Sequence, residues 1–229
     1  MAWYYWQDLT GPELATLADD AALAVLPVAA VEQHGPHLPL ATDVTIGEGL
    51  LGAALERLRG DGAPVFVLPT LAIGASLEHT NFAGTLSLAP ETAITTIESI
   101  GAALARAGVR RLLLFNSHGG NKAVLDLAAL KLRAAQDMLV VKANYFRFAA
   151  PANTLAAQEM AHGLHGGALE TSLMLHFAPE AVRRAHIADF KPIGARRAEA
   201  GATLLPEGDA GFAWMAEDLH PAGVAGDAR

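Results

Sequence analysis

The chain has 229 residues, of which 52% are hydrophobic and 17% charged, and its formal net charge is −8. This composition indicates a globular protein with a large buried core and excludes a disordered chain. The negative charge argues against a nucleic-acid partner and an anionic membrane surface, and the absence of cysteine excludes disulfide bonds, thiolate zinc sites and a cysteine nucleophile.

The N-terminal segment begins with a cluster of aromatic residues. Residues Trp3 to Trp6 are all aromatic, which predicts packing on the protein's own core or, alternatively, a subunit interface. Residues 12–20 are expected to form a short helix. The segment contains neither a basic region nor a cleavage-like site, so we expect no signal peptide and a cytoplasmic protein.

The longest apolar run, Ala21–Val31, predicts a buried strand that is too short to span a bilayer. Four potential metal ligands follow it closely: Glu32, His34, His37 and Asp43. If the strand continues two residues past Val31, its period of two places Glu32 and His34 on the same side. Carboxylates and imidazoles that converge at a strand end indicate a metal site. The alternative is a polar loop in which the histidines make hydrogen bonds and Asp43 caps a helix.

Helices and strands alternate along the rest of the chain. Helices are expected at residues 45–58, 90–107, 122–136 and 168–177, and strands at residues 63–68, 111–115 and 139–146. This alternation, with strands apolar on both faces, is typical of an α/β protein, here a three-layer α/β/α sandwich with a mostly parallel central sheet. We expect a single domain over residues 1–229, with mostly loop from residue 196 onward.

Polar residues gather after successive strands, where ligands bind in open parallel sheets. Ser76 and His79 lie in a long loop after the second strand, and Asn116 and His118 follow the third. The glycines after His118 allow a simple turn or a phosphate-binding loop, but neither the dinucleotide fingerprint nor a P-loop spacing occurs. Glu170, beside the apolar side of the last clear helix, needs a partner, which a metal or an arginine would supply.

Four segments in this order resemble the creatininase (creatinine amidohydrolase) family. They are Glu32-Gln33-His34-Gly35-Pro36-His37-Leu38-Pro39 with Thr42-Asp43, Gly74-x-Ser76-x-Glu78-His79, Asn116-Ser117-His118-Gly119-Gly120-Asn121, and His165-Gly166-Gly167-x-x-Glu170-Thr171-Ser172. The resemblance extends from about Leu26 to Phe177, and several motifs in register are more specific than any one of them. It implies an α/β/α fold, assembly into homohexamers and two divalent metals at the edge of the sheet.

The resemblance also implies a ligand set, which is Glu32, His34, Asp43, His118 and Glu170, with Asp43 bridging the two metals. Creatininase itself has a glutamate ligand two residues after the histidine of the third strand, where this chain has Gly120. Glu170 takes its place by analogy with branches of the family that carry the His-Gly-Gly-Asn form.

The remaining candidate residues are assigned to catalysis, substrate binding or support of the ligands. His165 is expected to protonate the leaving nitrogen, together with Glu170 as a catalytic group, or alternatively to support a ligand through a hydrogen bond. The substrate pocket is assigned to Ser76, His79 and Trp214, although Trp214 as a core residue is the alternative. The supporting residues are His37, Asn116 and Asn121.

We therefore predict a metal-dependent amidohydrolase that hydrolyses a cyclic or other non-peptide amide with a water that bridges two metals. Zinc is the preferred metal, with manganese and iron as alternatives. The two tryptophans that creatininase places around its substrate are not evident here, which disfavours creatinine itself. The alternatives are a formamide deformylase, a small-peptide peptidase and, from another class, a catalytically silent metal-stabilised binding protein.

The resemblance implies a further helix beyond the position of Arg229 in most members of the family. A truncation, a tail that is left out and a shorter natural form are the alternatives for this end of the chain.

Overall fold

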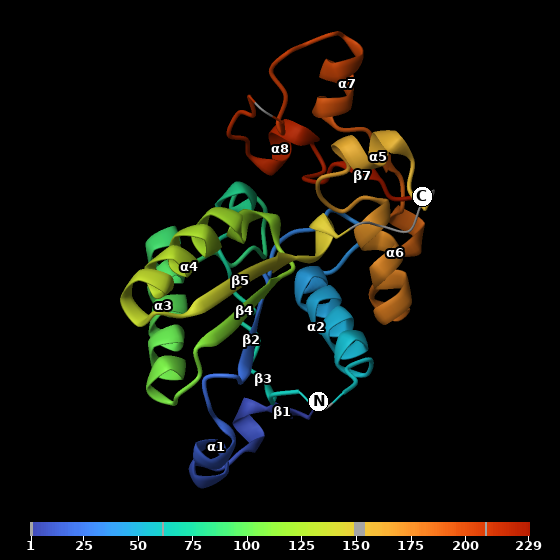
Figure 1. The fold of residues 1–229 in the computed structure, drawn as a ribbon. Coiled ribbons are helices and arrows are strands. Elements are labelled where there is room, and N and C mark those ends of the chain that lie inside the picture. Colours follow the sequence, from blue (N-terminus) through green and yellow to red (C-terminus); the bar gives the residue numbers. More distant parts are fainter. Residues whose placement is uncertain (1, 61, 149–153, 209) are drawn as a thin grey trace. The chain divides into compact units, whose positions relative to one another are not determined.

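The computed structural model describes residues 2–60, 62–148, 154–208 and 210–229, which form two compact units. The sheet unit consists of Met1–Ala30, Gly47–Ala75 and Ser87–Phe148, and the second unit of Val31–Ile46, Ser76–Leu86 and Ala149–Arg229. Figure 1 shows the elements of both. Within the described ranges, no helix combines the length and the apolar character that crossing a bilayer requires.

The sheet unit is built on five parallel strands in the order β1-β3-β2-β4-β5. Their bounds are β1 Trp3–Tyr5, β2 Leu23–Val28, β3 Val65–Val67, β4 Arg111–Asn116 and β5 Leu139–Asn144. The central strand β2 is buried along almost its whole length, as its run of Leu, Ala and Val requires. In register, Leu23 lies opposite Val65 on one side and Arg111 on the other.

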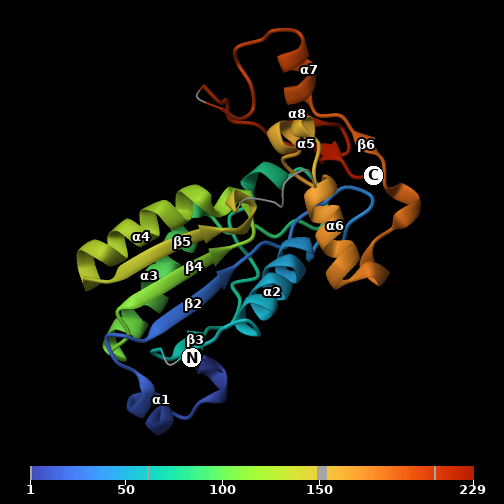
Figure 2. The same ribbon diagram turned by 45° about the vertical axis from the view of Figure 1, so that its right-hand side comes forward.

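Helices cover both faces of this sheet, as Figure 2 shows. The helices α3 (Pro90–Arg106) and α4 (Lys122–Gln136) lie side by side on one face, and α2 (Thr42–Leu55) lies on the other. Ile97 and Leu104 of α3 and Leu125 of α4 are almost completely buried in the core that these helices form with the sheet. The predicted three-layer α/β/α sandwich with a mostly parallel sheet is therefore confirmed.

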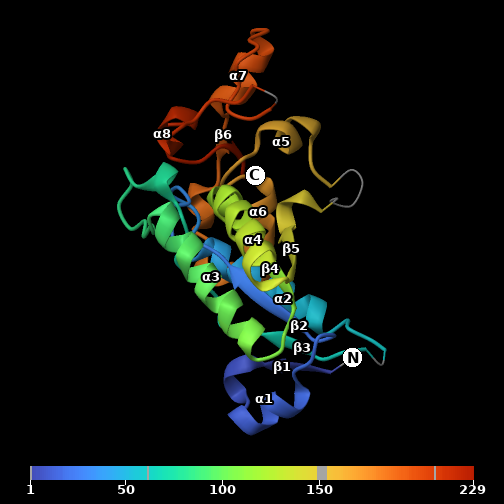
Figure 3. The same ribbon diagram turned by 60° about the vertical axis from the view of Figure 1, so that its left-hand side comes forward.

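The second unit contains short elements joined by long loops (Figure 3). Its helices are α5 (Ala157–His162), α6 (Ala168–Phe177), α7 (Ile193–Glu199) and α8 (Ala216–Leu219), and β6 (Asp189–Phe190) pairs antiparallel with β7 (Gly226–Asp227). A small core forms around Phe190, Val224 and Ala228. The second unit also contains the first residues of α2, because its first segment, Val31–Ile46, ends within that helix.

Several predicted elements are confirmed closely. The helices expected at residues 90–107, 122–136 and 168–177 are α3, α4 and α6. The helix expected at residues 12–20 is α1 (Gly11–Leu17), which begins with a capping box between Thr10 and Glu13. Proline at the start of α3 matches its preference for the first helical turn.

Most of the aromatic cluster at the N-terminus forms the strand β1, which was not predicted from the sequence, and Trp6 begins a 3-10 turn. In β1 the side chains alternate, so Tyr4 packs on the core while Trp3 and Tyr5 are exposed. The rings of Tyr4 and Trp6 lie 6.2 and 5.6 Å from the ring of Phe66. Packing on the protein's own core is therefore confirmed for half of the cluster.

The predicted extent of the first buried strand is wrong. β2 ends at Val28, and the backbone of Val31 pairs antiparallel with Leu86 within the second unit. Glu32 and His34 thus lie on a loop, and a strand period cannot explain their common direction. The helix expected from residue 45 begins at Thr42, so Asp43 is in its first turn. The strand expected to reach residue 146 ends at Asn144, and a 3-10 turn, Tyr145–Arg147, follows.

The C-terminal part contains more regular structure than expected. Residues 196–229 were predicted to be mostly loop, but α7, α8 and β7 lie wholly or partly in this range. These elements have two to seven residues, too few for a hydrophobic period to appear in the sequence. The single-domain organisation over residues 1–229 stays a prediction.

Candidate metal centre

The loop from Val31 to Leu40 holds two of the predicted ligands in a fixed conformation. The N–H of Glu32 donates to the carbonyl of Leu40 at 3.0 Å, which closes the loop. Gly35 adopts a φ of +66°, and a Cβ there would lie 2.7 Å from a methyl group of Val224. Only glycine meets both conditions, so the turn between Glu32 and Pro36 depends on it.

Three carboxylates of the second unit converge on one imidazole. The Nε2 atom of His34 lies 3.3 Å from Oδ1 of Asp43, 3.8 Å from Oε2 of Glu170 and 4.0 Å from Oε1 of Glu32. Glu32, His34 and Asp43 are at most 1% exposed. Buried carboxylates repel one another, so this arrangement favours bound protons or a cation among them.

The other side of Glu32 faces two further histidines. Its Oε1 atom lies 3.4 Å from Nε2 of His79, in the 3-10 turn Leu77–His79, and 3.7 Å from Nδ1 of His165. Both imidazoles are buried, and the ring of His165 lies 4.2 Å from the rings of His34 and His79. Six of the predicted site residues, Glu32, His34, His79, Asp43, His165 and Glu170, thus come together within one unit.

The donor set fits a divalent cation. In this unit, Glu32, His34 and His165 form one group whose ligand atoms lie within 4.8 Å of one another, and His34, Asp43 and Glu170 form another. The Nδ1 atom of His34 lies 3.1 Å from the carbonyl oxygen of Glu32, which can only accept, so the ring proton is on Nδ1. Nε2 then presents its lone pair to the carboxylates when the ring is neutral. A cation between them would satisfy all these groups.

The close approach of these buried groups also shifts their pKa values in the metal-free protein. Burial lowers the pKa of His34, but the carboxylates of Asp43, Glu170 and Glu32 outweigh it and raise the pKa to about 9. Burial raises the pKa of Glu170 to about 7, with His34 opposing and Asp43 adding to the shift. The pKa of His165 is lowered by burial and by the neighbouring His34 and His79, so His165 is neutral at pH 7. The metal-free cluster therefore retains protons where a cation would bind.

Zinc binding is expected to release protons near neutral pH. Ligation needs His34 and Glu170 deprotonated, and their pKa values of about 9 and about 7 mean that both carry protons in the metal-free protein at lower pH. Zinc affinity should rise with pH from about 6 to about 9 as these protons leave. Calorimetric titration in two buffers of different ionisation enthalpy measures the release. Equal binding enthalpies in both buffers would contradict protonated ligands.

The remaining predicted residues lie in different environments. His37 is buried, and its Nε2 atom lies 2.9 Å from the carbonyl of Gly166 and 3.1 Å from Oγ1 of Thr171, at the start of α6. Ser76 is buried before the 3-10 turn that carries His79. Trp214 is half-buried in the segment between α7 and α8. A place for Ser76 and Trp214 in a substrate pocket stays a prediction.

His118 and its neighbours belong to the sheet unit. The Nε2 atom of His118 lies 3.0 Å from the carbonyl of Ala75, and the main chain of His118 is bound at both polar groups by the side chain of Asn116. Asn121 donates to Asn116 and to Ala29 and accepts from the N–H of Ala75. These amides fix the loop after β4. Their support of a metal ligand stays a prediction. The place of His118 among the metal ligands stays a prediction.

The carboxylate of Glu159, which was not predicted from the sequence, holds the turn before α6. Glu159 of α5 accepts the N–H of Ala168 and the N–H of Asp227, both at 2.8 Å. A Cβ at Gly163 or Gly167 would collide with this carboxylate. Burial raises the pKa of Glu159, and the two backbone donors oppose that shift. The pair of glycines around the turn was a signal for close packing, but the distant glutamate has no signature of its own.

The substitution Glu159→Ala is expected to destabilise the protein by about 2–6 kcal/mol, because two backbone N–H groups lose their acceptor at about 1–3 kcal/mol each. Glu159→Gln keeps one acceptor and should cost less. Denaturant unfolding of both variants measures the effect, with Glu180→Ala, an exposed glutamate of the same unit, as the control. A midpoint for Glu159→Ala equal to that of the control would contradict the role of Glu159 in holding the turn.

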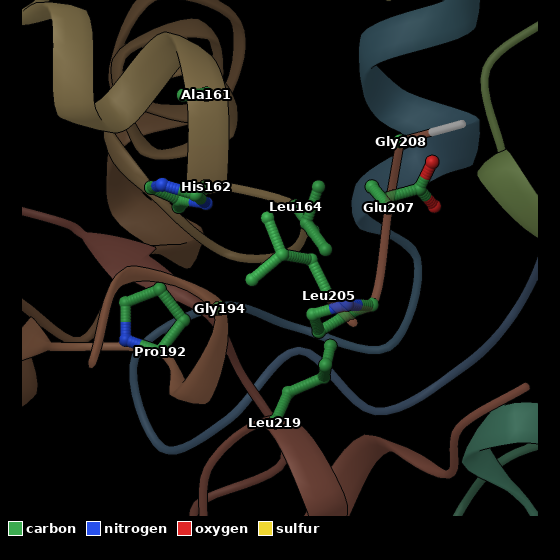
Figure 4. Close-up of a pocket in the computed structure, with 10 residues that line it drawn as sticks. Ala161, His162, Leu164, Pro192, Gly194, Leu205, Glu207, Gly208 and Leu219 are labelled. Atoms are coloured by element: carbon green, nitrogen blue, oxygen red, sulfur yellow. The ribbon is translucent and has the colours of Figure 1, made fainter. Parts of the chain in front are cut away.

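An apolar cavity of about 270 Å³ lies elsewhere in the second unit. Figure 4 shows the side chains of Leu164, Leu205 and Leu219 around it, with the ring of Pro192 at its side. None of the predicted site residues lines it, although Leu164 directly precedes His165. The cavity is therefore not the candidate metal centre.

Comparison with known proteins gives a consistent result. A family model described as creatininase, creatinine amidohydrolase, matches residues 7–229. The mycofactocin precursor peptide peptidase of Mycobacterium tuberculosis is 35% identical over 165 residues, and the alignment covers 69% of this chain but only 60% of that relative. The creatinine amidohydrolase of Pseudomonas putida is 35% identical over 197 residues, which cover 79% of this chain and 73% of the relative.

Solved structures of creatininase have the same fold. A mutant creatininase of the Zn-Zn type superposes with a TM-score of 0.73 at 30% identity and covers 98% of this chain and 87% of its own. A creatininase structure designated Mn superposes with a TM-score of 0.67 at 32% identity, over 82% of this chain and 78% of its own. The chain is thus similar to creatininase both in sequence and in fold.

Proposed function

Because the chain belongs to the creatininase (creatinine amidohydrolase) family, we propose that it is a metal-dependent hydrolase that cleaves the C–N bond of an amide. The family predicted from the sequence is confirmed by this membership, and the class of hydrolase is part of the proposal. The observation that carries the proposal is the convergence of Asp43, Glu170 and Glu32 within 4.0 Å of Nε2 of His34.

The proposed centre holds two divalent ions, preferably zinc, with manganese or iron as alternatives. Glu32, His34, Asp43 and Glu170 would hold them together with His118, and Asp43 would bridge the pair. Carboxylate and imidazole ligands without thiolate suit these ions, and the similar creatininase structures include Zn-Zn and Mn forms. Such a pair of ions supplies a hydroxide at neutral pH and polarises the amide carbonyl.

The proposed reaction consumes water and separates the amide into an acid and an amine. Hydroxide adds to the carbonyl carbon, the C–N bond breaks, and the proton that water loses must reach the leaving nitrogen. His165 is suited to move that proton through Nδ1, because this atom faces the carboxylate cluster while Nε2 lies 2.7 Å from a backbone carbonyl. Glu170 is the alternative proton carrier, since its pKa of about 7 allows both charge states at neutral pH.

His79 was assigned to the substrate pocket, but its position favours another role. Its Nε2 atom lies 3.4 Å from Oε1 of Glu32, and its Nδ1 atom lies 2.8 Å from the side-chain amide of Gln33. Both nitrogens thus have neighbours within the protein, which suits a residue that orients a ligand.

The preferred substrate class is a small cyclic or other non-peptide amide. A short peptide is the second candidate, because mycofactocin precursor peptide peptidases are 33–35% identical to this chain. The proposed reaction serves both classes, since each places one carbonyl carbon beside one leaving nitrogen. Formamides are a third class that the same chemistry would serve.

We also propose that the protein is a cytoplasmic homohexamer. Sedimentation analysis of the purified protein tests its oligomeric state.

Chelation and reconstitution test the proposal. The purified protein is analysed for metal content, treated with a chelator, reloaded with zinc or manganese, and assayed on creatinine, other cyclic amides, N-formyl amides and short peptides. We expect turnover of at least one class that chelation abolishes and metal restores. A protein that binds metal and loses thermal stability on chelation, yet turns over none of these amides, would instead be a metal-stabilised binding protein.

A further inference from the structure

Gln33 lies between two predicted ligands in the sequence, and its side-chain amide is buried. Its Oε1 atom accepts the N–H of Gly35 at 2.9 Å, and its Nε2 atom donates to the carbonyl of Gly223 at 2.5 Å. Because a backbone N–H only donates and a carbonyl only accepts, these two contacts fix which end of the amide is nitrogen.

The orientation of this amide determines the tautomer of His79. The amide nitrogen of Gln33 lies 2.8 Å from Nδ1 of His79 and has a second N–H available for it. Nδ1 of His79 must therefore accept, which leaves the ring proton on Nε2. The protonated Nε2 lies 3.4 Å from Oε1 of Glu32.

The main chain of Gln33 determines the tautomer of His165 in the same way. Nε2 of His165 lies 2.7 Å from the carbonyl oxygen of Gln33, so Nε2 must carry the proton. Nδ1 of the neutral ring then presents its lone pair toward Oε1 of Glu32, 3.7 Å away. The contact of 3.4 Å between the amide nitrogen of Gln33 and Nε2 of His165 joins two donors and adds no hydrogen bond.

The packing around Gln33 keeps both interactions in place. Gly223 has a φ of +73°, and a Cβ there would lie 2.6 Å from Oε1 of Gln33 and 2.7 Å from the ring of Phe82. The N–H of Gln33 donates to Oγ1 of Thr85 at 3.1 Å. A turned-over amide would place its oxygen against the carbonyl of Gly223 and its nitrogen against the N–H of Gly35, so hydrogen bonding keeps the amide in this orientation.

We propose that Gln33 is a positioning residue that fixes both histidines with their proton on Nε2, His79 through its side chain and His165 through its main chain. His79 then offers an N–H to Glu32, which orients that carboxylate. His165 offers a lone pair at Nδ1 on the side of the carboxylate cluster. The use of Nδ1 as the proton acceptor rests on the proposed function, whereas the assignment of the tautomers does not.

Two-bond ¹H–¹⁵N correlation spectra of the zinc-loaded protein at neutral pH test the assignment, since the two ring nitrogens differ in shift between tautomers. The signals are identified by comparison with His79→Gln and His165→Gln. We expect both histidines to carry their proton on Nε2. A proton on Nδ1 of either one in the unmodified protein would overturn the inference, and this result requires no variant at Gln33.

The variant Gln33→Glu tests whether the side chain of Gln33 sets the tautomer of His79. This change replaces the amide donor that faces His79 with a carboxylate acceptor, so Nδ1 of His79 should gain a proton. His165 should keep its proton on Nε2, because the main-chain carbonyl of residue 33 is unchanged. The control Gln158→Glu makes the same change on the exposed side of α5 and should alter neither ring. An unprotonated Nδ1 of His79 in folded Gln33→Glu would show that Gln33 does not set its tautomer.

Activity provides a separate readout. On the substrate found by the amide assay, kcat for Gln33→Glu should fall by about 10–100-fold, as is usual for groups that orient metal ligands, while Gln158→Glu should retain it. Absence of turnover in the unmodified protein would contradict the proposed function and leave the spectra as the test of the tautomers. A failure of the proposed function can therefore be distinguished from a wrong assignment of the tautomers.

Discussion

Replacing Asp43 with asparagine is expected to remove bound metal and to lower kcat/KM by roughly 1,000-fold or more, since the ions contribute several kcal/mol to the transition state. Asp43 lies in the first turn of α2, is 1% exposed and comes closest of the three carboxylates to Nε2 of His34, at 3.3 Å. The amide keeps the volume of the side chain but loses the charge that a bridging ligand supplies. Elemental analysis and steady-state kinetics measure the two effects.

The matched control for this variant is Asp126→Asn on α4. Asp126 is an exposed aspartate that pairs with Lys142, so the same change of one charge should leave metal content and kcat/KM unaltered. Chelation should lower the thermal midpoint of the unmodified protein and of Asp126→Asn, but not that of Asp43→Asn. Full metal occupancy and activity in Asp43→Asn would refute the bridging role.

The second large effect is expected for Glu170→Gln, which should cost metal and lower kcat/KM by about 100–1,000-fold. One carboxylate oxygen of Glu170 accepts the N–H of Gly166 at 2.6 Å and lies 3.8 Å from Nε2 of His34. The glutamine amide can still accept from Gly166, so the turn before α6 should remain while the charge toward His34 is lost. Metal content per chain and kinetics are the measurements.

This variant also tests whether Glu170 supplies the ligand that creatininase has at the position of Gly120. If Glu170 supplies the missing ligand, Glu170→Gln should bind fewer than two metals per chain, whereas Glu180→Gln, an exposed control, should bind as many as the unmodified protein. Two fully occupied sites in Glu170→Gln would show that another group completes the centre.

The regular part of the fold could be predicted from the sequence because its periods are long and its boundaries carry known signals. α3 starts at Pro90 and α4 fills the 15 residues expected of it. The short elements could not be predicted in this way. β1 has three residues and α8 has four, and both are too short for a hydrophobic period to repeat often enough to be recognised.

Most residues of the buried carboxylate and histidine cluster could be named from the sequence, but the strand period that predicted their convergence is wrong. Glu32 and His34 converge because a closed loop around Gly35 directs them, whereas the strand ends at Val28. The side chains that hold this arrangement were harder to foresee. Glu159 acts across 68 positions on Asp227, and Gln33 reaches Gly223 across 190, distances at which one sequence contains no pairing signal.

The path of the chain has a consequence for recombination and protein engineering. The chain passes between the two units after Ala30, Ile46, Ala75, Leu86 and Phe148, and the second unit takes Glu32 and Asp43 from its first segment, His79 from its second and Glu170 from its third. No short contiguous gene fragment encodes this constellation, because its residues span positions 32 to 170. It cannot be transplanted as a short cassette, and a swap between relatives at one crossover point inside that range would combine ligands of two different parents.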